Sequence, residues 1–357
     1  MQTSLGIIEG FYGKLYLKEA RNSLLSFASN HGFSYYIYAP KNDKELRRNW
    51  KDNFSKEKIA YLKEFSSFCH KQNMAFGIGI SPLEISNEVD ASLPILLNKI
   101  DIAINEFKTD IIAILFDDIK LYTSDEGIKQ NFIVNQIFEH IKDKDIRLIF
   151  CPTYYSFDPI LDKVFGKCPE NYFEQIVEGL NTNIEVFWTG NKVLSKSITK
   201  DDIEKINALF KRKVTIWDNY PVNDGKFICK KIYTREFSNR TNLDGITLSH
   251  AVNPMLEAEL TKISIATLPL CYKNQEKDFL TQTRLNLIKD LFKLTGNDFK
   301  ILLNHLDKLN DFGIDEFTKE EKDSLFALCC KSGTKVANDI IDFLNGVYAF
   351  DPACLTS

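Results

Sequence analysis

The sequence predicts an α/β fold, a closed (β/α)8 TIM barrel followed by a small all-helical C-terminal segment. Short β-branched and aromatic runs alternate with longer segments of helical period through about residue 270. No glycine-rich G-x-G-x-x-G turn follows the first predicted strand, which argues against an open dinucleotide-binding sheet. After this alternation the strand patterns cease. We therefore expect a catalytic barrel over residues 1–272 and a helical domain over residues 273–357.

The predicted strands are rich in Ile, Phe and Tyr, as expected for strands covered by helices. They are residues 4–9, 33–39, 74–80, 110–116, 145–150, 183–189, 213–217 and 244–249. The predicted helices are residues 17–31, 56–72, 91–107, 126–142, 170–179, 199–211 and 254–268. In the second of these helices, Leu62, Phe65 and Cys69 share one apolar face. Thr199 stands at the N-cap position of the sixth.

The segment after residue 272 has only helical patterns. The charged stretch KNQEKD precedes an apolar stripe that includes Leu280 and Ile288. Thr318 and Glu321 have the spacing of a capping box at the start of a later helix. We expect these helices to pack against the barrel.

The composition is that of an ordinary globular protein. Of 357 residues, 44% are hydrophobic, and 45 Lys and Arg against 49 Asp and Glu leave a formal net charge of −4. This balance gives no basic footprint for nucleic acid or an anionic membrane, and no run approaches the ~20 apolar residues of a membrane span. The opening MQTSLGIIEGFYG lacks the features of a secretory signal, so we expect a cytoplasmic location. The eight cysteines lack CxxC spacing and are expected to be reduced thiols, neither a disulfide framework nor a zinc site.

Catalytic residues of this architecture gather at the carboxyl ends of the strands. There the sequence places acids, amides, aromatic residues and one lysine, without a histidine cluster or a Cys/His pair. Aromatic faces suit the C–H surfaces of a pyranose ring, and carboxylates and amides suit its hydroxyl groups. The segments concerned are residues 9–13, 39–43, 116–118, 151–155, 188–190, 217–219 and 253–254. Their chemistry indicates a sugar-binding site.

The adjacent carboxylates Asp117 and Asp118 are the most informative single feature. They follow the apolar run IIAILF, so they emerge from a buried strand at the mouth of the predicted barrel. Burial and like-charge proximity both raise the pKa of a carboxyl group, so one of the two is expected to stay protonated near neutral pH. Two other interpretations remain open. The pair could be a helix N-cap beside a solvent-facing acid, or magnesium ligands, which would need a phosphate-binding loop that the sequence lacks.

Adjacency also constrains the mechanism, because neighbouring side chains leave a strand in different directions. Asp117 and Asp118 are therefore poorly placed as the nucleophile and acid of an ordinary retaining glycosidase, which lie ~5–5.5 Å apart across the glycosidic bond. A neighbouring pair better suits a substrate that supplies its own nucleophile. One acid then protonates the leaving oxygen while the other polarises a 2-acetamido group, as in substrate-assisted hydrolysis.

Several segments follow the order found in one enzyme family. They are GIIEGFYG (6–13), YIYAPKND (36–43), LFDDI (115–119), CPTYY (151–155), FWTG (187–190), IWDN with a following NDG (216–219, 223–225) and NPM (253–255). On these segments the chain resembles glycoside hydrolase family 84, the β-N-acetylglucosaminidases that include O-GlcNAcase and the bacterial hyaluronidase-like enzymes. EGFYG and the paired aspartates together carry most of the specificity, and the resemblance covers residues 5–270. It implies a retaining exo-β-N-acetylglucosaminidase that works through an oxazoline intermediate.

The resemblance also implies roles for individual residues. Asp117 would orient and polarise the acetamido group, and Asp118 would act as general acid and then general base. The positions implied to bind the sugar are Gly10, Lys41, Tyr155, Trp217, Asn219, Asp224 and Asn253. No metal or organic cofactor is implied. The expected partner is a glycan or glycoprotein that bears terminal β-linked GlcNAc, with no nucleic acid and no membrane.

Simpler interpretations stay open for some of these residues. Trp217 could belong to the core, and Lys41 could be a solvated loop charge. Tyr154 stands where some family members carry an acid and receives no role, and His250 is expected to be a hydrogen-bonded neighbour rather than a catalyst. For the whole chain, the alternatives are a non-catalytic glycan-binding barrel and an endo-acting glycosaminoglycan hydrolase.

Overall fold

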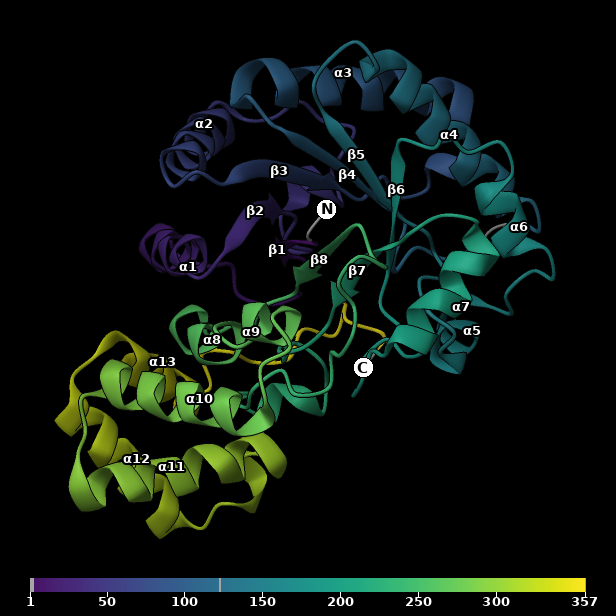
Figure 1. Ribbon diagram of the computed structural model, residues 1–357. Helices are drawn as coiled ribbons and strands as arrows, with labels where there is room; N and C mark the ends of the chain where they lie inside the picture. Colours follow the sequence, from purple (N-terminus) through teal and green to yellow (C-terminus); the bar gives the residue numbers. More distant parts are fainter. Residues whose placement is uncertain (1–2, 122, 357) are drawn as a thin grey trace.

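Eight parallel strands close into a barrel, which confirms the predicted fold class (Figure 1). The computed structural model describes residues 3–121 and 123–356. The strands pair in sequence order, and the last strand pairs back onto the first, with His250 opposite Leu5. They are β1 (Ser4–Glu9), β2 (Phe33–Tyr38), β3 (Ala75–Ile80), β4 (Ile111–Leu115), β5 (Arg147–Cys151), β6 (Ile184–Trp188), β7 (Thr215–Asp218) and β8 (Ser249–Val252).

Helices surround the barrel, mostly where amphipathic segments predict them (Figure 1). They are α1 (Lys18–Asn30), α2 (Lys56–Lys71), α3 (Val89–Phe107), α4 (Glu126–Ile141), α5 (Pro159–Phe165), α6 (Tyr172–Val177), α7 (Lys200–Phe210), α8 (Ala258–Ile265) and α9 (Leu268–Tyr272). Helix α5 was not predicted, and its start signal is local: Asp158 caps it, and Pro159 occupies the first turn. Residues 219–248, all of which are described, form no α-helix between β7 and β8, only the 3-10 turn η3 (Ile228–Lys230).

The eighth strand lies away from its predicted position. The prediction places it at residues 244–249, whereas β8 covers Ser249–Val252. Gly245 has φ 75° and Leu248 is 45% exposed, so the predicted stretch forms the turn that leads into the barrel. The residues of β8 are all buried and pair with β1 and β7. Because the sequence SHAV has little strand preference of its own, pairing with both neighbours determines the strand.

The helix-start signals in the sequence are confirmed. Thr199 caps α7 in a reciprocal capping box with Asp202. Thr318 and Glu321 form the same arrangement at the start of a helix beyond the barrel. In both boxes the threonine side chain accepts from the backbone N–H three residues on, and the acid accepts from the backbone N–H of the threonine.

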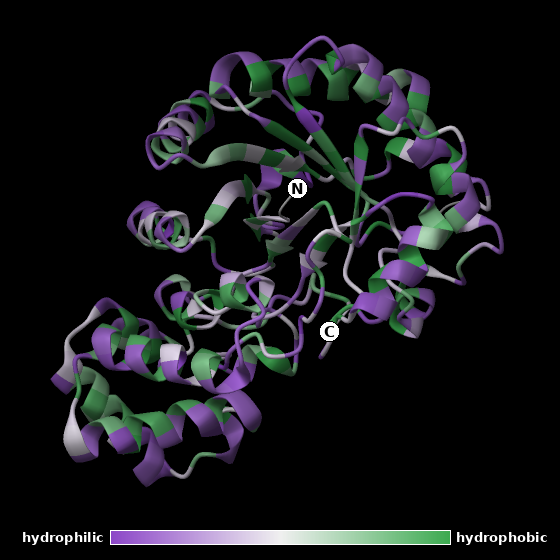
Figure 2. Ribbon diagram, in the orientation of Figure 1, coloured by the Kyte–Doolittle hydropathy of each residue, from purple (hydrophilic) through white to green (hydrophobic). Residues whose placement is uncertain are grey.

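Apolar side chains from the strands form the core of the barrel. All five residues of β4, with the sequence IIAIL, are buried, as expected for a parallel strand covered on both faces. Figure 2 shows hydrophobic residues on the strands and on parts of the surrounding helices, and hydrophilic residues over much of the outer surface. Small residues make room for large ones, since a Cβ on Gly6 would lie 2.1 Å from the ring of Tyr35.

Beyond α9 the chain forms a helical lobe beside the barrel (Figure 1). It consists of α10 (Lys277–Phe292), α11 (Gly296–Asp311), α12 (Lys319–Ser332) and α13 (Lys335–Leu344). Its apolar core also includes Leu260 and Ile263 of α8. Asp339 of α13 accepts hydrogen bonds from the backbone N–H groups of Glu259 and Leu260, at 2.8 and 3.2 Å. The lobe therefore packs against the barrel, while the domain division between residues 272 and 273 stays a prediction.

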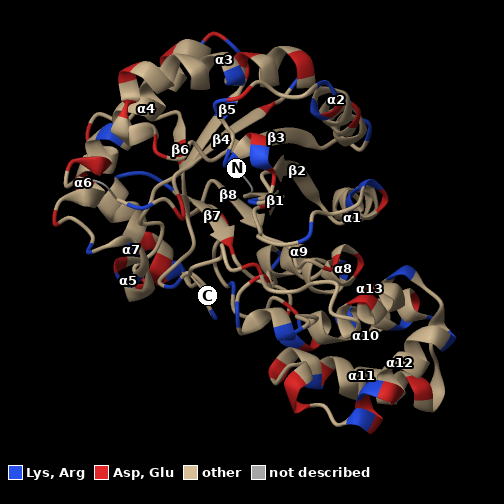
Figure 3. Ribbon diagram, turned by 180° about the vertical axis from the view of Figure 1, so that it is seen from behind, with Lys and Arg blue, Asp and Glu red and all other residues tan. Residues whose placement is uncertain are grey.

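The surface carries charges of both signs. Acidic and basic residues are interspersed on the outer helices and the lobe, and the strands carry few (Figure 3). Within residues 3–121 and 123–356, we find no helix that combines the length and the apolar character needed to cross a lipid bilayer.

Candidate active site

One cavity at the carboxyl ends of the strands contains every site residue that the sequence predicts. The cavity opens to solvent and encloses about 490 Å³ of space when the open solvent at its mouth is included, and we call it the mouth cavity. The predicted residues that line it are Gly10, Lys41, Asp117, Asp118, Tyr155, Trp217, Asn219, Asp224 and Asn253. The other residues that line it are Tyr12, Cys151, Thr189, Val193, Leu194, Val222, Ile228, Cys354 and Thr356. Residues from distant parts of the chain thus meet in one space.

Asp117 and Lys41 form a buried ion pair in the mouth cavity. Lys41 Nζ lies 2.5 Å from Asp117 Oδ2, and the two residues are 5% and 6% exposed. The backbone N–H of Lys41 donates to the carbonyl of Phe11 (3.0 Å), which ties the end of β2 to the loop after β1. The interpretation of Lys41 as a solvated loop charge is therefore wrong. Asp117 Oδ1 is buried and has no hydrogen-bond partner among the described residues, which leaves it available as an acceptor.

Asp118 lies at a sharp turn after β4. Its φ of 56° is in the left-handed region, which aspartate tolerates better than most residues. The turn interrupts the alternation of the strand, so the side chain of Asp118 lines the same cavity as that of Asp117. Its Oδ2 accepts from the hydroxyl of Tyr12 (2.9 Å) and its Oδ1 from the hydroxyl of Tyr155 (3.2 Å). Burial, followed by the neighbouring Asp117 carboxylate, raises the pKa of Asp118.

The two other interpretations of the aspartate pair can now be weighed. The N-cap interpretation is wrong, because the next helix, α4, begins at Glu126 with Asp125 at its N-cap position. The Lys41 ammonium argues against the magnesium interpretation, because it already lies as a cation beside Asp117. Within the described ranges, no group of three or more His, Cys, Asp or Glu side chains is arranged to hold a metal ion.

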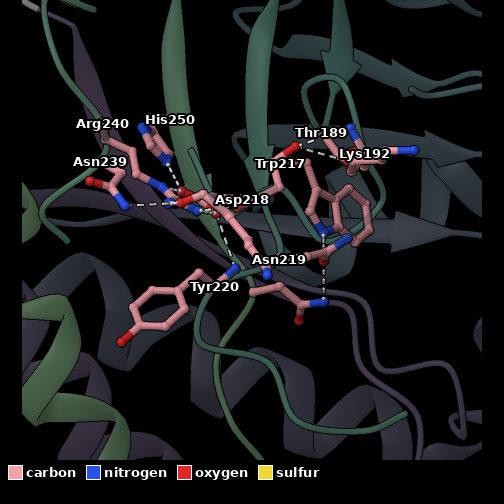
Figure 4. Close-up of polar contacts among 12 residues, drawn as sticks. Thr189, Lys192, Trp217, Asp218, Asn219, Tyr220, Asn239, Arg240 and His250 are labelled. Carbon is pink, nitrogen blue, oxygen red and sulfur yellow. Dashed lines mark hydrogen bonds and ion pairs between the residues drawn. The ribbon is translucent and has the colours of Figure 1, made fainter. Parts of the chain in front are cut away.

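Trp217 forms one wall of the mouth cavity, and a series of amides holds it there (Figure 4). Its Nε1 donates to Asn219 Oδ1 (2.8 Å), which also accepts from Asn253 Nδ2 (3.0 Å). The backbone N–H of Gly10 donates to Asn253 Oδ1 (3.2 Å), and Asn219 Nδ2 donates to the carbonyl of Val193 (3.0 Å). A Cβ on Gly10 would lie 2.4 Å from the indole ring, so only glycine lets the ring approach the backbone this closely. Four of the predicted residues therefore form one connected wall.

Asp218, which follows Trp217, supports this wall from behind (Figure 4). It accepts two hydrogen bonds of 2.7 Å from Arg240, and His250 Nε2 lies 3.1 Å from its Oδ2. Arg240 also donates to two backbone carbonyls in the loop after β6. Burial by itself would raise the pKa of Asp218, but the Arg240 guanidinium lowers it well below its usual range. His250 is fully buried, does not line the cavity, and is hydrogen-bonded to its neighbours, as expected.

Asp224 brings a third carboxyl group into the cavity from the loop after β7. Its Oδ2 accepts from the backbone N–H of Tyr12 (2.8 Å). Burial, opposed by that hydrogen bond and reinforced by the Asp118 carboxylate, raises the pKa of Asp224 to about 6. Tyr12 thus contacts two acids, with its hydroxyl on Asp118 and its backbone on Asp224.

Other conspicuous residues near the strand ends do not line the mouth cavity. Glu9, from the EGFYG motif, is fully buried and accepts two hydrogen bonds of 2.7 Å from Arg21 of α1. The hydroxyl of Tyr154 donates to a backbone carbonyl that follows α5. Trp50 and Trp188 belong to the core. These residues have structural roles outside the mouth cavity.

Of the nine cavity residues that were not predicted as site residues, three bear on the proposed chemistry. Tyr12 lies two positions after Gly10 in a motif that was already singled out, so its place at the end of β1 was an available signal. Cys354 and Thr356 lie beyond α13, where no pattern in the sequence points to the site.

Comparison with known proteins assigns the chain to a family. A family model described as beta-N-acetylglucosaminidase matches residues 5–304. Protein O-GlcNAcase of Rattus norvegicus and that of Mus musculus are each 31% identical to this chain over 279 residues. The matched region is 75% of this chain, and the chain spans only 30% of the length of each relative.

A solved structure shares the fold. A variant of the O-GlcNAc hydrolase of Thermobaculum terrenum has a TM-score of 0.73 with this chain at 23% identity. The likeness covers 96% of this chain and 80% of that one, so it extends beyond the barrel. By the family model and its relatives in sequence, the chain belongs to glycoside hydrolase family 84, the β-N-acetylglucosaminidase family.

Proposed function

We propose that this chain is a retaining exo-β-N-acetylglucosaminidase that uses substrate-assisted catalysis, with Asp117 and Asp118 as its catalytic pair. The observation that carries the proposal is the unequal setting of two neighbouring carboxyl groups in one cavity. Asp117 is paired with the Lys41 ammonium at 2.5 Å. Asp118 accepts from two phenol hydroxyls, and its pKa is raised. A general acid needs its proton near neutral pH, which favours Asp118 for that role.

Asp117 has the acceptor that an acetamido group requires. Its buried Oδ1 lacks a partner among the described residues. A substrate N–H donating to this atom would satisfy a buried acceptor and turn the acetamido oxygen towards the anomeric carbon. Asp117 would then polarise the amide as positive charge develops on it in the transition state.

The reaction takes two steps. In the first, the acetamido oxygen bonds to the anomeric carbon as the bond to the leaving oxygen breaks and Asp118 gives its proton to that oxygen. The product is an oxazolinium ion, or the oxazoline once Asp117 takes the amide proton. In the second, the Asp118 carboxylate removes a proton from water, whose oxygen attacks the anomeric carbon and reopens the ring, and Asp117 returns the amide proton if it has taken it. Two inversions give net retention.

The remaining residues would hold the sugar. Tyr155, Trp217 and Asn219 would surround the acetamido group and the oxazoline. Gly10, Lys41, Asp224 and Asn253 would contact the hydroxyl groups of the ring. The hydrogen-bonded wall of Trp217, Asn219 and Asn253 supports this assignment, because contacts that are already in place cost no reorganisation when the substrate reacts.

The proposed substrate is a glycan or glycoprotein with terminal β-linked GlcNAc. All nine predicted site residues line one cavity at a single end of the barrel, which supports an enzyme that takes one terminal sugar. The expected cytoplasmic location and the expected absence of a nucleic acid or membrane partner stay predictions.

An assay with two matched substrates tests the proposal. We expect the chain to hydrolyse an aryl β-GlcNAc glycoside and to cleave the matching β-glucoside, which lacks the amide, at least about 100-fold more slowly. Proton NMR at early times should show the β-anomer of GlcNAc. Turnover of neither substrate would favour the glycan-binding barrel, and equal turnover of both would overturn substrate assistance. Short oligosaccharides released from hyaluronan would favour the endo-acting alternative.

A further inference from the structure

Residues 349–356, which follow the helical lobe, return to the barrel and reach the mouth cavity. Helix α13 ends at Leu344, and the yellow stretch after it leaves the lobe and runs back to the barrel (Figure 1). Cys354 and Thr356 line the same cavity as Asp117 and Asp118. We call residues 349–356 the strap. The catalytic pair of the proposed function therefore shares its cavity with a peptide of its own chain.

The strap faces the cavity with alternate side chains. Cys354 is 7% exposed, the next residue, Leu355, is 55% exposed, and Thr356 again lines the cavity. This alternation is that of an extended chain, in which successive side chains point to opposite sides. A small thiol and a small hydroxyl thus lie inside, as the side chains of an extended peptide ligand would.

Thr356 stands on the side of the cavity where the leaving group belongs. It lines the cavity together with Tyr155, whose pKa its side chain affects, and the hydroxyl of Tyr155 donates to Asp118 Oδ1 at 3.2 Å. In the proposed reaction Asp118 faces the leaving oxygen. The alcohol of a threonine therefore shares the cavity with the general acid, near its partner Tyr155, and an alcohol is the group that a glycosylated serine or threonine would leave behind.

The strap has a fixed base and is held by exposed contacts of Asp351 as well as by Cys354 and Thr356 inside the cavity. Tyr348, just before it, packs against the cores of both the barrel and the lobe. In the strap itself, Asp351 Oδ2 accepts from Asn42 Nδ2 (2.7 Å), next to Lys41 of the cavity. Asp351 also closes a turn, since its Oδ1 accepts from the backbone N–H of Ala353 (2.9 Å). The exposed contacts exchange readily with water, and the cavity contacts of Cys354 and Thr356 are made with the barrel, so the strap can leave without unfolding the lobe.

We propose that the strap occupies the leaving-group side of the mouth cavity as an internal peptide, which a glycosylated polypeptide must displace before its sugar reaches Asp118. The proposal rests on the proposed function, because it assigns the leaving-group side from the role of Asp118. The strap then competes with peptide-linked substrates. A ligand that carries only the sugar leaves it in place.

Alkylation of Cys354 in the full chain measures displacement of the strap directly. The probes are a non-hydrolysed peptide that carries β-S-linked GlcNAc and a GlcNAc thiazoline, which has no peptide. Calorimetry verifies binding, and mass spectrometry follows alkylation of Cys354 and of the exposed Cys330 on α12 as an internal control. The glycopeptide should raise the alkylation rate of Cys354 by at least about tenfold, because a buried thiol reacts from the opened state. The thiazoline should not raise it, and the rate at Cys330 should stay constant.

The outcomes separate the strap from the proposed function. Binding of both ligands with the Cys354 rate unchanged or slowed would make the strap a permanent wall and overturn its displacement, while leaving the glycosidase intact. If neither ligand binds and an aryl β-GlcNAc glycoside is not turned over, the strap proposal and the proposed function would both be overturned.

A variant that weakens the strap gives a kinetic test. Asp351→Ala removes the contact with Asn42 and should lower KM for an O-GlcNAc peptide roughly fivefold, the effect of about one net hydrogen bond, with kcat unchanged. Asp298→Ala, which removes a comparable exposed contact with Lys331 on the lobe, is the control and should leave KM as in the wild type. An unchanged or raised KM for Asp351→Ala would overturn the competition.

Discussion

At the scale of single residues, Asp117 and Asp118 are neighbours in sequence whose carboxyl groups have different partners. The positive φ of Asp118 turns its carboxyl group into the cavity between the hydroxyls of Tyr12 and Tyr155. Asp117, two residues after the end of β4, forms an ion pair with the ammonium of Lys41. One strand end thus supplies two acids with separate tasks.

Replacing Asp118 tests its role as the proton donor. Asp118→Asn should lower kcat/KM by about 10³-fold for a substrate with a poor leaving group, and far less for an aryl glycoside whose leaving group needs no proton. Because the pKa of Asp118 is raised and its protonated form is the active one, the basic limb of the wild-type kcat/KM profile should report its titration. That limb should vanish in the variant. Equal losses on both substrates would contradict the role.

Replacing Asp117 tests its contact with the amide. Asp117→Asn should weaken a GlcNAc thiazoline, which resembles the intermediate, by roughly 10- to 100-fold, the range for a lost hydrogen bond to a charged group. Inhibition constants measured beside Tyr154→Phe provide the control, since Tyr154 is close in sequence but does not line the cavity. Unchanged inhibition in Asp117→Asn would remove its proposed function.

At the scale of elements, the start of α8 contains a buried acid that the proposed reaction does not use. Glu257 precedes the first residue of α8 and is fully buried, and its Oε2 accepts from Asn223 Nδ2 (2.8 Å). Burial, only partly opposed by that hydrogen bond, raises the pKa of Glu257 from 4.5 to about 8. The folded state therefore holds a proton here across a pH range in which the unfolded state does not.

This proton makes stability depend on pH. The contribution of protonated Glu257 to the free energy of unfolding is fully present below pH 4.5 and is lost as the pH rises through about 8. Glu257→Gln keeps a neutral group at this position at every pH. Between pH 5 and pH 8, its free energy of unfolding should therefore fall by on the order of 3 kcal/mol less than that of the wild type. Urea unfolding at several pH values measures this difference, and exposed Glu19→Gln is the control. Parallel profiles for the wild type and Glu257→Gln would contradict the expectation.

At the scale of the whole molecule, the barrel and the helical lobe share structure at α8. The second apolar core takes Leu260 and Ile263 from α8, and Asp339 of α13 accepts from the first backbone N–H groups of that helix. The lobe therefore lacks a core made from its own residues alone.

Shared packing predicts cooperative unfolding. Because loss of the lobe would expose one face of α8, the two parts should unfold in one transition. Tryptophan fluorescence reports on the barrel, since all three tryptophans lie at positions 50, 188 and 217, and far-ultraviolet circular dichroism also reports on the lobe. The two signals should give coincident urea midpoints. Separated midpoints would instead support the predicted division into domains 1–272 and 273–357.

Much of this organisation was predictable because it depends on local patterns. The Thr199 capping box needs only two side chains three residues apart, and β4 needs only a continuous apolar run. The prediction failed where partners decide the structure. The sequence SHAV forms β8 because it pairs with β1 on one side and β7 on the other. The four residues by themselves do not indicate these partners.

By itself, the sequence predicted the barrel, the family and nine of the eighteen residues that line the mouth cavity. Parallel strands of a closed barrel all end at the same rim, which predicts where the site lies, and the resemblance to the family implied the individual residues. Only the tertiary structure decided how Asp117 and Asp118 differ, that Tyr12 joins them, and that the strap reaches the cavity. These features arise from contacts between residues far apart in the chain, whose geometry is set by packing of the whole molecule and not by any local pattern.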